Sequence, residues 1–251
     1  MPQVYVGDAN LYYDEFGVGD PLLIVHGMLD TGRSHARLAL TLSSHYHVIA
    51  PDLRGYGRSE PRPRRFGADF YARDAADLAG LLEQLHFTAV RVLGFGDGAE
   101  AALLLALAAP DRIRAVIAVD VSGAFTPALL EVLPTLGNWA APDSRDGLVM
   151  RAEAYRDYGS AGTVAIWAGW KAAVRAIVAA GGDISLSQAG RIACPVFILN
   201  GATDPLNPVA QSETLAAAIP QADLQLVPDM EQLMYHTTLL TDLVTQWFAT
   251  H

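Results

Sequence analysis

Closely spaced glycines follow an apolar stretch in the middle of the chain. Residues 90–95 are apolar enough for a buried strand, and Gly94, Gly96 and Gly98 alternate through the turn that leads into the apolar run 101–109. Between a strand and a helix, a turn of the form Gly-x-Ser-x-Gly presents a serine hydroxyl as the nucleophile for acyl transfer. In this chain the middle position is Gly96, so the turn is present and the reacting hydroxyl is absent.

Three other segments carry polar residues directly after apolar runs. His26 follows one such run, Asp52 begins a turn that contains two glycines, and Asp204 follows a run late in the chain. Short apolar runs of this kind predict strands that are buried on both faces. The sequence therefore predicts polar residues at the ends of several buried strands.

Strands and helices are predicted to alternate along most of the chain. The predicted strands cover residues 4–6, 11–16, 22–25, 46–50, 90–95, 115–121, 196–200 and 222–227. The predicted helices cover residues 34–43, 70–85, 101–109, 208–218 and 239–248. This alternation predicts an α/β fold with a mostly parallel sheet and helices on both faces.

The alternation stops between residues 123 and 190. Helical stretches are predicted near 147–158 and 162–180, and tryptophans are concentrated there. We interpret residues 123–190 as a helical cap inserted over the ends of the strands. Residues 1–122 and 191–251 then form the core.

Several separated motifs occur in one order along the chain. They are His26-Gly27, the Asp52-x-x-Gly55-x-Gly57-x-Ser59 turn, the glycine turn around Gly96, and Gly201-Ala202-Thr203-Asp204-Pro205. In these motifs the chain resembles the α/β-hydrolase superfamily over essentially its whole length. The aspartate that follows the centre of the glycine turn, and the single helical cap, are most similar to valacyclovir-hydrolase-like serine esterases. The resemblance implies the α/β-hydrolase fold.

The resemblance places a Ser–Asp–His triad at positions 96, 204 and 232. Only Asp204 matches, because Gly96 stands in place of serine and Gln232 in place of histidine. Glycine offers no nucleophile, and glutamine cannot accept and return a proton near neutral pH. Loss of a triad nucleophile or base lowers turnover by roughly a millionfold, so ordinary esterase activity is not expected. His236, which follows Gln232, is a candidate substitute base.

The resemblance also implies an oxyanion hole made by the backbone N–H groups of Met28 and Asp97. Backbone donors remain when a side chain is lost, and such a hole plus ligand binding leaves roughly 10³–10⁴-fold acceleration over water. The Asp97 side chain could be a replacement nucleophile, an acid that favours the start of a helix, or a carboxylate that accepts a ligand ammonium. We favour the carboxylate that accepts a ligand ammonium slightly over the acid at the helix start.

Structural roles are predicted for several other polar residues. His26 is expected to shape the oxyanion loop through local hydrogen bonds, and Asp52 and Arg54 to close the glycine turn. His45 and His47 have no matching ligand set elsewhere in the sequence, so no metal site is expected. The tryptophans of the insertion are expected to form its core more readily than to line a pocket.

Composition limits the kinds of partner. The net charge of −10 and the isoelectric point near 5.0 argue against nucleic acid and anionic membranes. The basic run 62–65 is expected to be a solvated loop, and the single cysteine, Cys194, excludes an internal disulfide. We expect a soluble, cytoplasmic protein that binds a small molecule without a cofactor. The oligomeric state is not predicted.

Functional alternatives remain open at this level. The favoured interpretation is a hydrolase-family protein with a capped pocket for a small ester-like or acyl ligand. A non-catalytic binding protein on the same scaffold, or an inactivated variant of an active esterase, also fits the substituted triad. A lyase or isomerase that uses Asp204, Asp97 or His236 for proton transfer is a further alternative.

A dinucleotide-binding protein is the remaining alternative. Gly94-x-Gly96-x-x-Ala99 fits the dinucleotide fingerprint, and Asp120 ends the next strand, where an acid would bind a ribose. That interpretation leaves the His26-Gly27 motif and the motif around Asp204 without a role.

Overall fold

An eight-stranded, mostly parallel sheet forms the centre of the computed structural model, which describes residues 2–134, 145–230 and 237–251. Along the sheet the strands lie in the order β1-β2-β4-β3-β5-β6-β7-β8. Their bounds are Gln3–Val6, Ala9–Phe16, Asp20–Val25, Tyr46–Pro51, Val90–Phe95, Ile113–Val119, Val196–Gly201 and Ala222–Val227 for β1 to β8. Strand β2 pairs antiparallel with β1 and β4, and the strands from β4 to β8 pair in parallel. The predicted fold class is confirmed.

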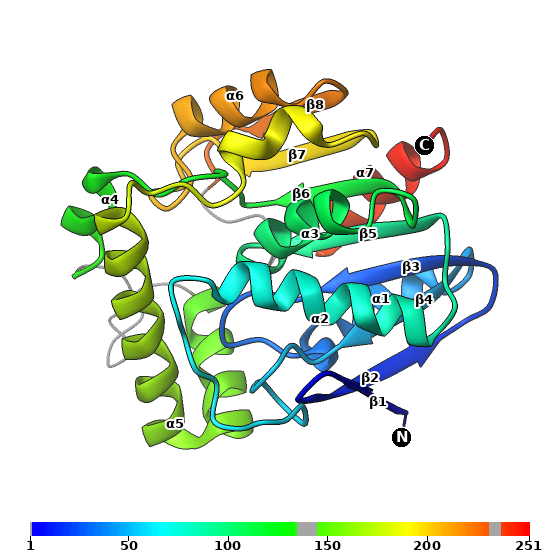
Figure 1. The fold of residues 1–251 in the computed structure, drawn as a ribbon, viewed down its shortest axis with the longest axis horizontal. Coiled ribbons are helices and arrows are strands. Elements are labelled where there is room, and N and C mark those ends of the chain that lie inside the picture. The colour runs from blue at the N-terminus through cyan, green and yellow to red at the C-terminus, as the bar shows by residue number, and fades with distance from the viewer. Residues whose placement is uncertain (1, 135–144, 231–236) are drawn as a thin grey trace.

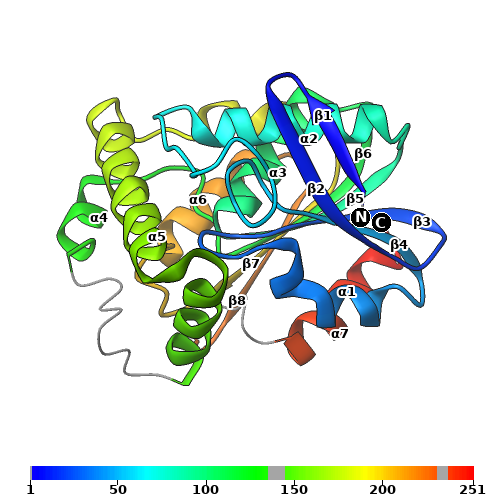
Figure 2. The ribbon, with the colours of Figure 1, turned by 90° about the horizontal axis from the view of Figure 1, so that it is seen from below.

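Helices cover both faces of this sheet (Figures 1 and 2). The helices outside the insertion are α1 (Ala36–Leu42), preceded by the 3-10 helix η1 (Gly32–His35), then α2 (Phe70–Gln84), α3 (Asp97–Ala108), α6 (Val209–Ala218) and α7 (Thr237–Phe248). One apolar core includes buried residues of α2, α3 and α6, and a second includes buried residues of α1 and α7. The two cores lie on opposite faces of the sheet.

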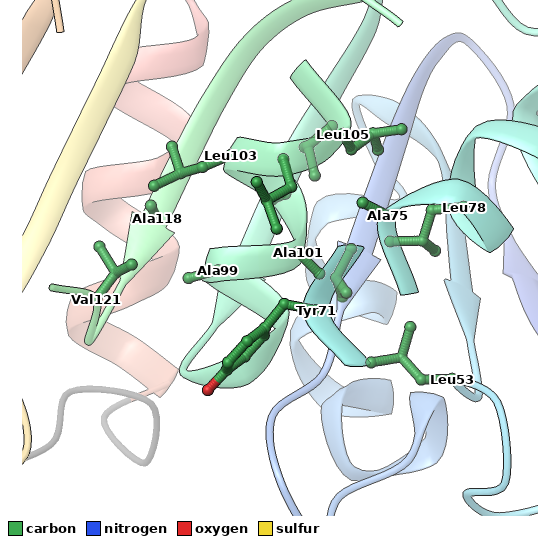
Figure 3. Packing of buried hydrophobic residues seen from close by; sticks show 14 of the residues in the cluster. Leu53, Tyr71, Ala75, Leu78, Ala99, Ala101, Leu103, Leu105, Ala118 and Val121 are labelled. Carbon is green, nitrogen blue, oxygen red and sulfur yellow. The ribbon is translucent and has the colours of Figure 1, made fainter. Parts of the chain in front are cut away.

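Strand β5 shows why the central strands are mostly apolar. Val90 and Val92 belong to the core beneath α2 and α3, whereas Leu93 and Phe95 belong to the core beneath α1 and α7. Alternate side chains of a strand point to opposite faces, so a strand covered on both faces is mostly apolar. Arg91 is the exception in β5, and its buried guanidinium pairs with Asp20. Small residues on α3, including Ala99, let this helix lie close to its neighbours (Figure 3).

The segment between β6 and β7 contains α4 (Pro127–Val132), α5 (Arg145–Ala179) and the 3-10 helix η2 (Leu186–Arg191). Helices α4 and α5 lie together at one end of the molecule, away from both chain termini (Figure 1). Gly159 has a φ of 68° and a ψ of 167°, which breaks α5 into two helical pieces. This break separates the two helical stretches that the sequence predicts.

The basic run 62–65 is not wholly solvated, which corrects the expectation from sequence. The Arg64 side chain is buried, and its Nη2 lies 2.5 Å from Oδ2 of Asp74 on α2. The guanidinium also lies over the ring of Tyr56, 4.9 Å from its centroid. Arg62 is more than half exposed and pairs with Glu60, as a surface residue would. A run of like charges cannot reveal that one member has a buried partner eight or more residues away.

No helix in the described part of the chain is both long and apolar enough to cross a membrane.

Candidate active site

The three glycines of the β5–α3 turn are required for different reasons. A Cβ on Gly94 would lie 2.5 Å from the carbonyl oxygen of Gly98, and a Cβ on Gly98 would collide with the carbonyl oxygens of Val25 and His26. These two positions therefore need glycine because backbones approach closely. Gly96 differs, because a Cβ there would meet no described atom within 4 Å.

The backbone of Gly96 is in the left-handed region, with a φ of 52° and a ψ of −118°. Residues with a side chain rarely adopt this conformation, and they do so mainly at functional sites. Gly96 directly precedes α3, whose first residue is Asp97. The turn thus has the backbone of a strand–nucleophile–helix turn, with open space where a side chain would project.

Two backbone N–H groups lie beside this turn. Strands β3 and β5 are parallel neighbours with Val25 opposite Gly94, so the loop containing Met28 leaves the sheet next to the glycine turn. Asp97 is the first residue of α3, so its backbone N–H has no acceptor within the helix. Among the described residues neither it nor the N–H of Met28 donates a hydrogen bond. Both donors are therefore available to an oxyanion or a carbonyl oxygen.

The Asp97 carboxylate faces α2 and the insertion. Its Oδ1 accepts hydrogen bonds from the Tyr71 hydroxyl at 2.7 Å and from Nε1 of Trp170 at 3.1 Å. Its Oδ2 is buried without a hydrogen-bond partner among the described residues. Burial raises the pKa of Asp97 to about 6. Asp97 thus lies in the first turn of α3, as predicted. Its hydrogen bonds to α2 and to α5 were not predicted from the sequence.

Asp204 follows β7 and is buried. Its Oδ1 accepts the backbone N–H of Leu206 at 2.8 Å, and its Oδ2 accepts Nδ2 of Asn207 at 2.8 Å. Strand β7 is parallel to β5 and separated from it by β6, so the two loops leave the same edge of the sheet. Gln232 and His236 lie outside the described residues, so their positions relative to Gly96 stay predictions.

Known proteins are similar to this chain in sequence and fold. A family model described as the alpha/beta hydrolase fold matches residues 20–143. The protein named serine hydrolase BPHL from Homo sapiens is 29% identical over 233 residues, which cover 90% of this chain and 78% of that protein. This chain has the α/β-hydrolase fold. The family model and this relative support the predicted membership of the α/β-hydrolase superfamily.

Solved structures have the same fold. The structure titled "Est816 as an N-Acyl homoserine lactone degrading enzyme" superposes with a TM-score of 0.80 at 21% identity, covering 98% of this chain and 100% of that one. The enol-lactonase from Burkholderia xenovorans LB400 gives a TM-score of 0.78 at 21% identity, covering 99% and 100%. At these identities the likeness establishes the fold alone.

In this hydrolase fold, His26 has a structural position. Its side chain is fully buried, its Nδ1 lies 2.7 Å from the carbonyl oxygen of Gly27, and its Nε2 accepts the N–H of Leu53 at 2.9 Å. The pairing assigns the ring proton to Nδ1. Burial lowers the pKa of His26, so the ring is neutral and ties the loop after β3 to the turn after β4.

Asp52 closes the glycine turn as predicted. Its Oδ1 accepts the N–H of Gly32 at 2.8 Å, and its Oδ2 accepts both the N–H and the Nε of Arg58. Arg54 has a different role from the predicted one, since it pairs with Asp77 and Asp8 and so ties the turn to α2 and to the loop after β1. Sequence reasoning missed Arg58 as the partner of Asp52.

Glu100 is a further buried acid, and sequence reasoning missed it. It is 3% exposed, its Oε1 accepts the N–H of Gly123 at 2.6 Å, and its Oε2 accepts the hydroxyl of Ser185 at 2.8 Å. Burial raises the pKa of Glu100 to about 7. A glutamate within an otherwise apolar helix was the available sequence signal, because an acid is almost never fully buried without partners.

The tryptophans of the insertion form its core, as expected. Trp167 and Trp170 are buried and stack with their ring centroids 5.2 Å apart. Trp170 also donates to Asp97, so one residue serves both the core of the insertion and the edge of the site. The third tryptophan of the insertion, Trp139, lies outside the described residues.

A polar cavity of about 180 Å³, which Gly96 does not line, lies between the turn after β4 and α5. It is lined by Thr31, Arg33, Asp52, Gly57, Arg58, Arg156 and Asp157. Arg58 pairs with Asp52 and Arg156 with Asp157, so most of the charge in this cavity is already neutralised. Within the described ranges, no group of three or more His, Cys, Asp or Glu residues could hold a metal ion.

Proposed function

We propose that this chain binds a small, partly apolar ester-like or acyl ligand, with residues 123–190 acting as a cap and the serine triad degenerate. The observation that carries the proposal is the backbone of Gly96, which has the left-handed conformation of a nucleophile turn without a nucleophile. The similarity to a protein named serine hydrolase supports a hydrolytic ancestry. We further propose a cytoplasmic location and no cofactor, on composition alone.

The remaining groups define what the pocket could recognise. The N–H groups of Met28 and Asp97 would donate to a carbonyl or carboxylate oxygen of the ligand. Without a side chain at residue 96, no acyl-enzyme can form there, and any hydrolysis would depend on direct attack by water. Gln232 would leave that water without a base. We therefore expect binding with very slow turnover.

The experiment is ester hydrolysis by four proteins: the natural chain, Gly96→Ser, Gln232→His and the double variant. The panel contains short-chain acyl esters and α-amino-acid esters, because Asp97 could accept a ligand ammonium. We expect activity to appear only in the double variant. Gly190→Ser/Gln188→His is the matched control, because it makes the same two substitutions at exposed residues of η2.

Comparable activity in the natural chain and the double variant would contradict the interpretation that Gly96 and Gln232 stand in place of a catalytic serine and histidine. The absence of ester hydrolysis in all proteins would contradict a pocket derived from a hydrolase, provided that a thermal transition shows the double variant to be folded. That result would favour a binding protein or an acid–base enzyme. Enhanced NADH fluorescence on mixing would instead support the dinucleotide interpretation of Gly94-x-Gly96-x-x-Ala99.

A further inference from the structure

Two carboxylates on α3 connect the core to the insertion. Asp97 accepts the Trp170 indole N–H from α5 at 3.1 Å, and Glu100 accepts the N–H of Gly123 at 2.6 Å and the hydroxyl of Ser185 at 2.8 Å. Gly123 and Ser185 lie at opposite ends of the insertion. Residues three apart on a helix lie on one face, so both contacts come from the same side of α3.

The two ends of the insertion run side by side where Glu100 meets them. The carbonyl oxygen of Gly123 accepts the N–H groups of Ile184, Ser185 and Leu186. Ala124 and Asp183 form an isolated antiparallel bridge. Glu100 therefore contacts the base of the insertion at both connections to the sheet, while Asp97 contacts it further along α5.

We propose that Asp97 and Glu100 form a latch that holds the insertion closed over the position of Gly96, and that loss of their protons loosens it. The inference rests on the proposed function of the insertion as a cap. It adds a regulation of the same site, since ligand entry would depend on pH.

The surroundings of the two acids explain the direction of the effect. Tyr71 and Asp74 of α2, Arg64 of the preceding loop and Trp170 of α5 act on Asp97. Arg64 is the one cation of this group and is already paired with Asp74.

Glu100 is surrounded by Tyr71, Ser122, Gly123, Ser185 and Asp97, and none of these described groups is a cation. Burial is therefore the largest influence on both acids.

Opening the insertion would expose the two acids to water and return their pKa values toward the ordinary range. In the closed form the pKa of Asp97 is about 6 and that of Glu100 about 7. A group that binds its proton more tightly in the closed form favours that form at low pH and favours opening once the proton is lost. Between pH 5.5 and 8.5 the opening equilibrium should increase by up to about a hundredfold, with about thirtyfold from Glu100 and about fourfold from Asp97.

Hydrogen exchange of the full chain tests this proposal without a ligand. The measured amides are Gly123 and residues 184–186, at pH 5.5, 7.0 and 8.5, with each rate divided by the intrinsic rate at that pH. The proteins are the natural chain, Asp97→Asn, Glu100→Gln and the double variant. Asp183→Asn is the matched control, because Asp183 lies in the same segment but is exposed, and among the described residues its carboxylate accepts hydrogen bonds only from Ser187.

We expect the normalised exchange of the natural chain and of Asp183→Asn to rise steeply with pH. The rise should shrink to about fourfold in Glu100→Gln and vanish in the double variant. A flat profile in the natural chain, or an unchanged rise in the double variant, would overturn the latch. Amides of β5 and β6 distinguish local opening from global unfolding.

The ester assay is independent of this measurement. Gly96→Ser/Gln232→His can gain activity while the exchange profile is flat, which would reject the latch and keep the proposed function. A pH-dependent exchange profile without activity in the double variant would reject the proposed function. It would keep the latch, but the pocket would then have no hydrolytic ancestry.

Discussion

Gly96 is the residue on which the interpretation of the site depends. Sterically the position is open, because a Cβ would meet no described atom within 4 Å. Conformationally it is costly for any other residue, because φ is 52°. In an active hydrolase that cost is accepted because the strained residue supplies the nucleophile. Here nothing at this position requires a side chain, and glycine relieves the strain.

Gly96→Ser should therefore lower the free energy of unfolding by about 1–2 kcal/mol, which is the cost of a left-handed conformation for a residue with a Cβ. Urea unfolding of the variant and the natural chain measures it. Gly190→Ser is the control, since a Cβ there finds its nearest described neighbour at 3.6 Å and strains nothing, so its stability should not change. A Gly96→Ser protein as stable as the natural chain would show that the turn is not strained.

At the scale of elements, the loop that carries the glycine turn after β4 is anchored to α2 by charge. Arg64 and Asp74 have almost fully buried side chains and form two hydrogen bonds, at 2.7 and 2.5 Å. Removing one partner of a buried pair leaves the other charge without compensation in a dry environment. The pair thus fixes the loop to the helix that also carries Tyr71, one of the groups that hold Asp97.

Arg64→Ala should lower the free energy of unfolding by about 3–5 kcal/mol, because Asp74 would remain buried and unpaired. Arg62→Ala provides the control within the same basic run. Its ion pair with Glu60 is about half exposed, and surface pairs contribute at most about 1 kcal/mol. Equal losses in the two variants by urea unfolding would mean that the Arg64–Asp74 pair does not stabilise the fold.

For the molecule as a whole, buried titratable groups change the free energy of unfolding in opposite directions as the pH rises. The pKa of His26 is lowered, so its contribution is present above the unfolded value of 6.5 and is lost as the pH falls through the folded value. The pKa values of Asp97 and Glu100 are raised, so their contributions are present below the unfolded values of 3.8 and 4.5. Those contributions are lost as the pH rises through about 6 and about 7.

Asp97 and Glu100 should therefore together lower the free energy of unfolding by about 3 kcal/mol between pH 5.5 and 8.5, and His26 should offset part of this decrease in every variant. Asp97→Asn/Glu100→Gln should lack this decrease, because neither amide ionises. Glu131→Gln/Asp183→Asn removes the same charge from exposed positions and should keep it. Urea unfolding at both pH values measures the difference, and a decrease that survives in the first double variant would exclude these acids as its source.

The sequence by itself determined the order of the elements. Strands β5 and β8, helix α2 and the interrupted α5 lie within a few residues of the predicted ranges, because burial on both faces of a strand or one face of a helix fixes the spacing of apolar residues. It also determined that residue 96 lacks a hydroxyl and that a glycine turn surrounds it.

Only the tertiary structure decided which residues meet. Arg64 was expected in solvent and is buried, and Glu100 carried no recognised role although it contacts both ends of the insertion. Asp97 finds its partners on α2 and α5, 26 and 73 residues away. Periodicity reports only whether a position faces the core or the solvent. The partner of a buried charge depends on how distant elements pack, and a single sequence does not encode that pairing in its local pattern.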